Sequence, residues 1–387
     1  MTNTYDAIVI GAGHNGLTNA AYLAKAGLNV LMVEKNDYIG GATVSRALYR
    51  DDWLYSNCSY VCSLLRPEVY RSLNLAKYGL QVVPYGGSAT LSQDGDYIGS
   101  YVDPDISRRE VARFSERDAD ATVRYDRDIM RQCRFIRQFL LRTPPDPTSF
   151  KPRDLLEMLH LGKEAMKLGE DLIYDTMRFY TMSITDFLGE YFEHPLVIAS
   201  HSGSGIIGSA MGVMSPGTAY VLLHHAMGDV DGSMGAWGFA RGGMGAISKA
   251  MHDCFIDNGG ETVAGSPVEQ IIVKNGRARG VALENGNEYY ANVVVSNMTL
   301  PRTFLDCMDP KDLDEGFLKK VRNFKIRGSS GKLNIALDGV PDFTALRGNP
   351  ELIHGDMHLI DSTERLERAY DDWKNGIWSQ DPYIDML

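Results

Sequence analysis

The chain has 387 residues, of which 44% are apolar and 23% are charged, so it is long enough for one large or two modest hydrophobic cores. Its formal net charge of −11 at pH 7 and the lack of an evident basic face argue against a nucleic-acid partner. No stretch of the sequence reaches the apolar length of a transmembrane helix, although a local apolar patch would allow peripheral membrane contact. Because the first predicted strand begins close to the N-terminus, we expect no signal or transit peptide and a cytoplasmic location.

The N-terminal residues carry the pattern of a dinucleotide-binding turn. Residues 7–10 form a short apolar run that predicts a buried strand, and Gly11, Gly13 and Gly16 follow it before an apolar-periodic helix. In such a turn the first glycine permits a tight bend, the second lets the backbone approach a pyrophosphate, and the third lets helix and strand pack closely. The N-terminus of the helix then offers free N–H groups to the phosphates.

A second apolar strand is predicted over residues 28–33, and it ends at Glu34, 18 residues after Gly16. A carboxylate at this position can accept hydrogen bonds from ribose hydroxyls, and it argues against the 2′-phosphate of NADP. A glycine pair, Gly40-Gly41, follows closely. A plain NAD-binding unit does not need this pair, although an ordinary loop remains the alternative.

The next hundred residues predict a hairpin followed by long helices. A β-hairpin or meander is expected within residues 80–103, and a helix with a solvated charged face over residues 108–139. A proline cluster at residues 144–147 breaks this helix. A further helix is expected over residues 155–180, where a methionine-rich face indicates either core or an adaptable apolar pocket.

The second half of the chain changes character twice. Residues 181–250 are rich in glycine, which indicates many turns or a close approach of the backbone to a ligand. Three strands are then expected over residues 268–273, 279–283 and 293–295, and an Asn-Gly pair separates each from the next.

The sequence contains five cysteines. Cys58 and Cys62 are the close pair, and their spacing matches neither a Cys-x-x-Cys redox motif nor a zinc pattern with partner ligands. We therefore expect reduced, mostly buried thiols, and no metal site.

Several longer strings are specific enough to indicate a family. They lie at residues 9–17, 40–42, 59–68, 215–225 and 241–248. On these strings the chain resembles the flavin amine oxidase and phytoene desaturase superfamily, and within it the branch of pyridine nucleotide-disulfide oxidoreductase domain-containing protein 2. The likeness covers essentially the whole chain. The disulfide in the name of that branch has no counterpart here, because no redox cysteine pair is evident.

The resemblance implies an α/β fold in which a two-dinucleotide-binding-fold (glutathione-reductase-like) FAD domain is joined to a substrate domain of mixed sheet and helices. The FAD-binding domain would be discontinuous, over residues 1–75 and 236–302. The substrate domain would comprise residues 76–235 and 303–387.

The glycine pattern and the resemblance together indicate FAD as the cofactor. In such flavoproteins the strand that holds Val268 contacts the adenine through its backbone, and Gly243 lies near the flavin. The residues expected to bind FAD are Gly11, Ala12, Gly13, His14, Asn15, Gly16, Glu34, Lys35, Gly40, Gly41, Ala42, Thr43, Gly243, Val268 and Ser296.

The function that the resemblance implies is that of an FAD-dependent oxidoreductase, which takes hydride from a largely apolar small molecule in a desaturation or an oxidation. The alternative is a degenerate flavoprotein fold that acts as a binding or regulatory protein. His224 and His225 are candidate catalytic residues by type, because histidine titrates near neutral pH. Packed helix positions are the alternative interpretation of both.

The superfamily ends with a glycine-rich segment that covers part of the FAD, and no similar text follows Ser296-Asn297. A flavin left open on one side loses apolar burial, and surface meant for the missing part favours association. We therefore expect this chain alone to hold FAD weakly or not at all, and to form a homo-oligomer or to pair with a complementary C-terminal fragment.

Overall fold

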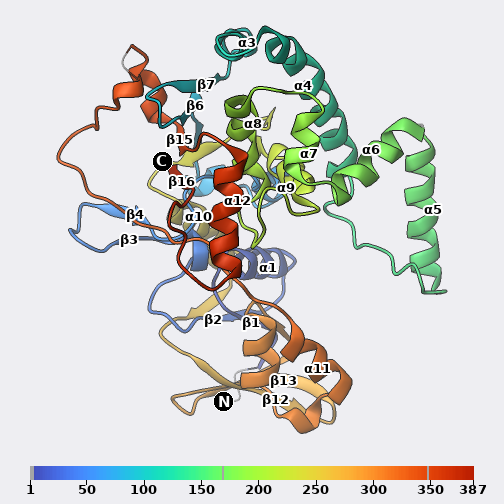
Figure 1. Cartoon of the computed structure of the whole chain (residues 1–387). Helices are drawn as coiled ribbons and strands as arrows, with labels where there is room; N and C mark the ends of the chain where they lie inside the picture. Colours follow the sequence, from blue (N-terminus) through green and yellow to red (C-terminus); the bar gives the residue numbers. More distant parts are fainter. Residues whose placement is uncertain (1–3, 168–169, 347) are drawn as a thin grey trace.

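A computed structural model describes residues 4–167, 170–346 and 348–387 (Figure 1). A six-stranded sheet lies in the lower part of the view, with strand order β11-β2-β1-β14-β13-β12. The strands are β1 (Thr4–Ile10), β2 (Val30–Val33), β11 (Glu261–Val263), β12 (Val268–Lys274), β13 (Arg277–Leu283) and β14 (Glu288–Ser296). The first four in spatial order are parallel, and β13 and β12 continue the sheet as antiparallel strands. All three strands expected in the second half of the chain are therefore confirmed.

Successive side chains of β1 belong to two different cores. Ala7 and Val9 belong to a cluster with helices α1 (His14–Lys25) and α10 (Gly245–Asp257). Ile8 and Ile10 belong to a second cluster, on the other face of the sheet, which also contains apolar side chains of the meander formed by β12, β13 and β14. Because side chains alternate along a strand, a continuous apolar run such as this one is buried on both faces.

A four-stranded sheet of order β16-β15-β6-β7 lies in the upper part of the molecule. Its strands are β6 (Gly87–Leu91), β7 (Tyr97–Tyr101), β15 (Asp356–Leu359) and β16 (Ile384–Met386). The hairpin expected within residues 80–103 is present as β6 and β7. The segment before it, β5 (Val82–Pro84), pairs instead with β10 (Gly238–Ala240), so the prediction of a local meander is wrong there.

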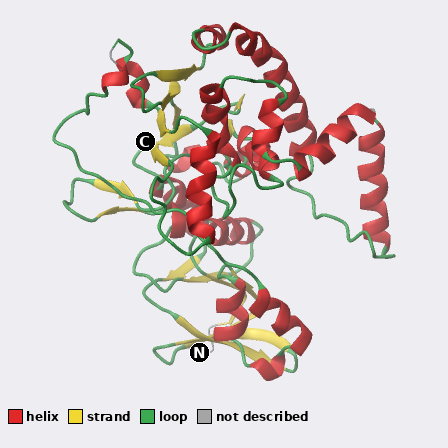
Figure 2. Ribbon diagram, viewed as in Figure 1, coloured by secondary structure: helices red, strands yellow, loops and turns green. Residues whose placement is uncertain are grey.

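Helices pack beside this upper sheet and surround a large apolar core (Figure 2). They are α3 (Pro104–Ala112), α4 (Glu116–Arg137), α6 (Glu170–Thr181), α7 (Ile184–Gly189), α8 (Pro195–Ser202), α9 (Thr218–Ala226) and α12 (Thr363–Lys374), whereas α5 (Pro152–Met166) contributes no residue to this core. The single helix predicted over residues 108–139 is two helices, because Ser115 caps α4 by accepting a hydrogen bond from the Asp118 N–H at 3.1 Å.

The methionine-rich helix expected over residues 155–180 also differs from the prediction. It is divided into α5 and α6, which extend away from the body of the molecule in Figure 1. No described residue of α5 is buried, and Met166 and Met177 are 78% and 65% exposed. The expectation that this face forms a core or lines a pocket is therefore wrong for α5, whereas α6 does bury Leu172 and Phe179.

Shorter elements connect the two parts. They are β3 (Ser45–Ala47), β4 (Leu54–Ser56), α2 (Pro67–Ser72), β8 (Asp229–Val230), β9 (Ser233–Met234) and α11 (Glu315–Asn323). Residues 303–323 lie with the lower sheet, because the Ile271 N–H donates to the Cys307 carbonyl at 2.7 Å and Cys307 belongs to that core. We therefore propose that the dinucleotide-binding part continues to about residue 323, beyond the limit of residue 302 expected from the sequence.

The five cysteines are free thiols, and Cys58 is the exposed one among them. Burial raises the pKa of Cys62 to about 11 and that of Cys133 to about 12, so both are neutral at physiological pH. Among the described residues, no helix combines the length and the apolar character needed to cross a bilayer.

The core between α1 and α10 allows a stability test at Phe255, whose side chain is completely buried. Phe255→Ala should lower the free energy of unfolding by about 3–5 kcal/mol, because it removes a large apolar side chain and leaves a cavity. The matched control is the neighbouring Ile256→Ala, where the side chain is 44% exposed and the change should stay within about 0.5 kcal/mol. Urea unfolding monitored by circular dichroism measures both, and equal losses in the two variants would contradict this assignment of the core.

Candidate dinucleotide site

The glycine turn lies where β1 ends and α1 begins. Gly11 has φ +95°, a conformation that glycine adopts without strain, and Gly13 is the N-cap residue of α1. No side chain caps this helix, and its first turn contains no acidic residue. The positive end of the helix dipole and its free N–H groups are therefore open to an anion.

Asn297 closes the turn from the side of β14. Its N–H donates to the Ile10 carbonyl at 2.9 Å, so the residue continues the register of the parallel pair. A Cβ placed on Gly13 would lie 3.1 Å from the Asn297 side-chain nitrogen, and one on Gly16 would overlap the Gly11 carbonyl oxygen. Gly16 is thus required by close packing, and a side chain at Gly13 would displace the Asn297 amide. No role was expected for Asn297 from the sequence, although its place directly after an apolar strand was the available signal.

Glu34 ties the end of β2 to the glycine turn. Its carboxylate accepts from the Ala12 N–H at 2.7 Å, and its other oxygen accepts from both the backbone and side-chain nitrogens of Asn36 at 2.9 Å. The side chain is buried, and a carboxylate oxygen can accept two hydrogen bonds. The oxygen bonded to Ala12 therefore keeps capacity for one further donor, such as a ribose hydroxyl.

The backbone of the next segment also reaches Glu34. The Ser266 N–H donates to the Glu34 carbonyl at 2.8 Å, and Val268 follows two residues later as a buried residue at the start of β12. The segment that leads into β12 and Val268 therefore runs beside Glu34.

The second glycine turn packs directly on the first. The Gly40 N–H donates to the Ala12 carbonyl at 2.8 Å, and Gly40 has φ +119°. A Cβ on Gly41 would lie 2.9 Å from the Gly13 Cα, so the two backbones meet without room for side chains. The Thr43 hydroxyl donates to the Gly40 carbonyl at 2.9 Å and also pairs with Ser248, so it is turned toward protein.

The remaining expected cofactor-binding residues lie in two environments. Asn15, Lys35 and Ala42 are exposed near the turn. Ser296 lies at the end of β14, with its hydroxyl 2.7 Å from that of Thr303.

Gly243 lies at the start of α10, where the β3–β4 hairpin supplies the caps. It has φ +81°, and a Cβ there would lie 2.5 Å from the Ser45 hydroxyl. That hydroxyl accepts from the Gly245 N–H at 2.8 Å, and the Ser56 hydroxyl accepts from the Met244 N–H at 3.0 Å. These bonds hold Gly243 beside the segment that follows Gly40 and Gly41.

His14 carries a buried polar atom beside the turn. Its Nδ1 atom is buried and has no hydrogen-bond partner among the described residues. Burial lowers the pKa of His14, so the imidazole is neutral at pH 7. A buried polar atom without a partner is unfavourable unless a ligand or water completes it. The turn, the open helix end and this atom together fit the pyrophosphate of a dinucleotide.

His224 and His225 lie on α9, away from the glycine turn in sequence and in fold. The Nδ1 atom of His225 is 3.0 Å from the Ser204 carbonyl oxygen and 2.9 Å from that of Val221. Because both neighbours only accept, Nδ1 carries the hydrogen and Nε2 remains an acceptor. Burial lowers the pKa of both histidines, so both are neutral at pH 7. The His225 ring lies 5.9 Å from that of Trp237.

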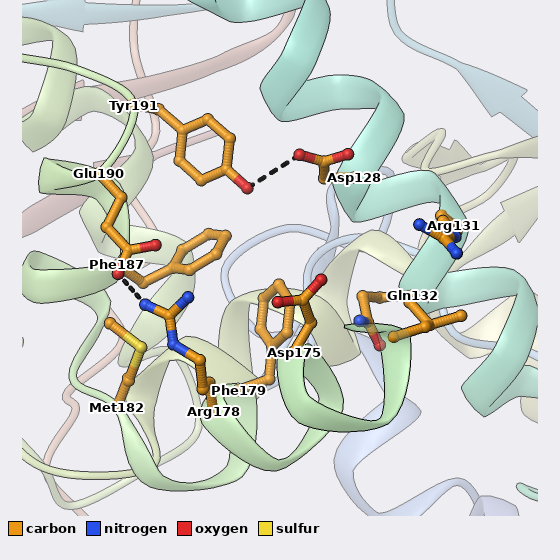
Figure 3. A pocket seen from close by; sticks show the side chains of 11 residues that line it. Asp128, Arg131, Gln132, Asp175, Arg178, Phe179, Met182, Phe187, Glu190 and Tyr191 are labelled. Atoms are coloured by element: carbon orange, nitrogen blue, oxygen red, sulfur yellow. Dashed lines mark hydrogen bonds and ion pairs between the residues drawn. The ribbon is translucent and has the colours of Figure 1, made fainter. Parts of the chain in front are cut away.

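A small polar pocket lies between α4, α6 and α7 (Figure 3). The Tyr191 hydroxyl donates to Asp128 at 3.2 Å across it, and Arg178 forms an ion pair with Glu190. Its volume of about 30 Å³ holds a water or two and excludes an organic substrate.

Comparison with known proteins agrees with this geometry. Residues 9–73 match the model of the NAD(P)-binding Rossmann-like domain. The chain is 33% identical to pyridine nucleotide-disulfide oxidoreductase domain-containing protein 2 of Mus musculus, over 99% of this chain and 69% of that protein. It is 26% identical to the chloroplastic prolycopene isomerase of Daucus carota, over 83% of this chain and 50% of that protein.

Solved structures show the same fold at low sequence identity. A putrescine oxidase variant superposes with a TM-score of 0.52 and 18% identity, over 83% of this chain and 64% of the other. An oxidoreductase from Methanosarcina mazei superposes with a TM-score of 0.50 and 16% identity, over 82% of this chain and 64% of the other. The chain thus spans a little less than two thirds of the length of these structures.

The packing at Gly16 allows a test of the turn. Gly16→Ala should destabilise the protein by about 1–3 kcal/mol, because the new methyl group has no room beside the Gly11 carbonyl. The control is Gly162→Ala in α5, where a Cβ meets nothing within 4 Å and where alanine favours the helix by up to about 1 kcal/mol. Thermal and urea unfolding measure both variants, and a Gly16→Ala protein as stable as Gly162→Ala would refute the close packing.

Proposed function

Because the chain belongs to the family of pyridine nucleotide-disulfide oxidoreductase domain-containing protein 2, we propose that it is an FAD-dependent oxidoreductase that takes hydride from a largely apolar small molecule. The observation that carries this proposal is the pair of glycine turns at the carboxyl end of β1, with Gly41 against Gly13 and with Glu34 beside Ala12. A crevice at the carboxyl ends of parallel strands is where nucleotides bind in open α/β sheets.

Two features support FAD over a nicotinamide dinucleotide at this position. The second glycine turn, around Gly40, extends the small-residue surface beyond the first turn, toward the capped start of α10. The meander of β12, β13 and β14 returns the chain parallel to β1, and this supports a two-dinucleotide-binding arrangement of the glutathione-reductase kind.

The proposed roles of the residues follow from their contacts. The open N–H groups of α1 and the unpaired Nδ1 of His14 would hold the pyrophosphate, and Glu34 would accept from a ribose hydroxyl. When bound, FAD supplies the two-electron acceptor for the reaction. The residues around it position the substrate and exclude water. His224 and His225 are neutral at pH 7 and are candidates for accepting a proton.

Flavin binding is the direct test of this proposal. Purified protein titrated with FAD should bind it, and the change in flavin fluorescence gives the Kd. Glu34→Ala should weaken the Kd for FAD by about 5- to 150-fold, because a ribose hydroxyl then lacks its acceptor at a cost of about 1–3 kcal/mol. Glu34→Gln keeps an oxygen for the Ala12 N–H and for a ribose hydroxyl, but it places an amide NH2 against the two Asn36 donors. Urea unfolding of the Glu34→Ala protein therefore separates lost binding from lost folding.

The matched control for this measurement is Glu269→Ala, which removes an exposed carboxylate from β12. It should leave the Kd unchanged. Anaerobic bleaching of the bound flavin by dodecylamine, 1-dodecanol or a conjugated polyene identifies the substrate class. A folded protein that takes up no FAD at any concentration would contradict the oxidoreductase and favour a binding or regulatory protein.

A further inference from the structure

A second group of titratable side chains lies on the four-stranded sheet. Asp356 and His358 are two residues apart on β15, so they point to the same face of the sheet. Asp385 of β16 is the cross-strand partner of His358. One ligand-type atom from each of the three side chains lies within 4.8 Å of the others.

The contacts within the group are short, and the group is largely buried. His358 Nε2 lies 3.1 Å from Asp356 Oδ2 and 3.8 Å from Asp385 Oδ1. The Tyr60 hydroxyl donates to Asp385 Oδ2 at 3.1 Å. Asp356 is 4% exposed. The Oδ1 atoms of both aspartates are buried without a hydrogen-bond partner among the described residues.

Aromatic side chains complete the surroundings of the group. The Tyr383 ring stacks on His358 at 5.9 Å, and its hydroxyl is buried without a partner among the described residues. Tyr85 also lies close enough for both aspartates to raise its pKa further, after the larger effect of burial. Lys332 lies beside Tyr60: its Nζ is 5.5 Å from the centre of the Tyr60 ring and donates to the Ser56 carbonyl at 2.7 Å.

Backbone contacts connect this group with the candidate dinucleotide site. The Ser59 N–H, next to Tyr60, donates at 2.9 Å to the carbonyl of Ala42 in the second glycine turn. The Tyr85 ring lies 5.4 Å from that of Phe239, which is on β10, the strand leading to Gly243. The group is therefore held by the same segments that shape the flavin side of the site.

On the other side the group is connected with α9. A Cβ on Gly203 would lie 2.5 Å from the Tyr383 hydroxyl, and the adjacent Ser204 carbonyl is 3.0 Å from Nδ1 of His225. The surrounding side chains are aromatic or titratable, as expected where a substrate reacts rather than where a core packs.

Two carboxylates this close repel each other, and burial makes each anion costly. Burial alone would lower the pKa of His358, but the hydrogen bond and charge of Asp356, with the charge of Asp385, outweigh burial and raise it. For Asp385, burial and the neighbouring Asp356 raise the pKa to about 7. For Asp356, the bonds to His358 and Asp385 outweigh burial, so its pKa is lowered.

We propose that Asp356, His358 and Asp385 form an acid–base site in which Asp385, held by Tyr60 and His358, accepts the proton that leaves the substrate. This role rests on the oxidoreductase function proposed above. In the step, an N–H, O–H or C–H bond of the substrate breaks, its electron pair stays on the substrate, and the proton binds the Asp385 carboxylate. A base that titrates near the working pH is the most effective one.

The proton site can be tested without substrate or flavin. In protein labelled with ¹⁵N at histidine, His358 should titrate above pH 6.5, and its signal is assigned by its absence from the spectrum of His358→Gln. Asp385→Asn should shift this titration to lower pH, because it removes a neighbouring negative charge. The control Asp338→Asn, at an exposed position, should not shift it. A His358 titration that Asp385→Asn leaves unchanged would overturn the inference.

The stability of the fold gives a second readout with a defined sign. The pKa of Asp385 in the folded protein, about 7, is above the value of about 3.9 for an unfolded chain. Its protonation therefore stabilises the fold fully below about pH 4, and this contribution is lost as the pH rises to about 7. Asp385→Asn should remove that dependence from urea unfolding, and Asp338→Asn should retain it.

Two further outcomes separate this inference from its alternatives. Tight, stoichiometric zinc binding that both Asp356→Asn and Asp385→Asn abolish would assign the group to a metal ion and overturn the proton site. With the probe that bleaches the flavin, Asp385→Asn should slow bleaching by about 10²-fold or more, whereas the exposed His354→Gln should not. If His225→Asn slowed bleaching and Asp385→Asn did not, the residue that accepts the proton would be His225 on α9 instead.

The inference and the proposed function fail in different ways. A protein that binds FAD but whose Asp385 does not titrate near pH 7 overturns the inference alone. If the group titrates as described but the protein binds no FAD, the oxidoreductase function is contradicted, and with it the role of the group in that reaction.

Discussion

The parallel pairing of β1 with β14 is the constraint on which the candidate site depends. It joins Thr4–Ile10 to the strand Glu288–Ser296 at the far end of the lower part, with Ile10 opposite Ser296. Because the two strands end at the same edge, Asn297 arrives beside Gly13 and Gly16. Without this pair, Asn297 would not pack against the glycine turn. The meander that covers the other face of β1 would also not be hydrogen-bonded to the sheet.

The second constraint is the contact between two backbones. Gly41 meets Gly13 at a separation that a Cβ would fill. The Ala12 backbone accepts from the Gly40 N–H through its carbonyl and donates to the Glu34 carboxylate through its N–H. One residue thus connects β1, β2 and the second turn. This explains why a carboxylate that can face a ligand is also part of the structure of the turn, so that binding and stability are linked at Glu34.

Electrostatics divides the histidines into two kinds. His14, His224 and His225 are neutral because burial lowers their pKa values. His358 differs because two carboxylates lie against it, and their negative charge outweighs burial. The upper sheet therefore holds a charged group that titrates near neutral pH, whereas the helix α9 presents neutral imidazoles. The two environments are connected through Gly203 and Tyr383.

By itself the sequence determined the local elements whose signal is short-range: the strand, turn and helix around Gly11, and the three strands of the meander. It determined these because glycine torsions and side-chain alternation act over a few residues. Where competing local signals were present, as at Ser115 and in the methionine-rich segment, helix limits and burial were predicted wrongly. Only the tertiary structure decided that Asn297 borders the turn, that β5 pairs with β10, and that Asp356, His358 and Asp385 converge. These contacts join residues far apart in the chain, and their register is set by the packing of whole sheets, which no local pattern encodes.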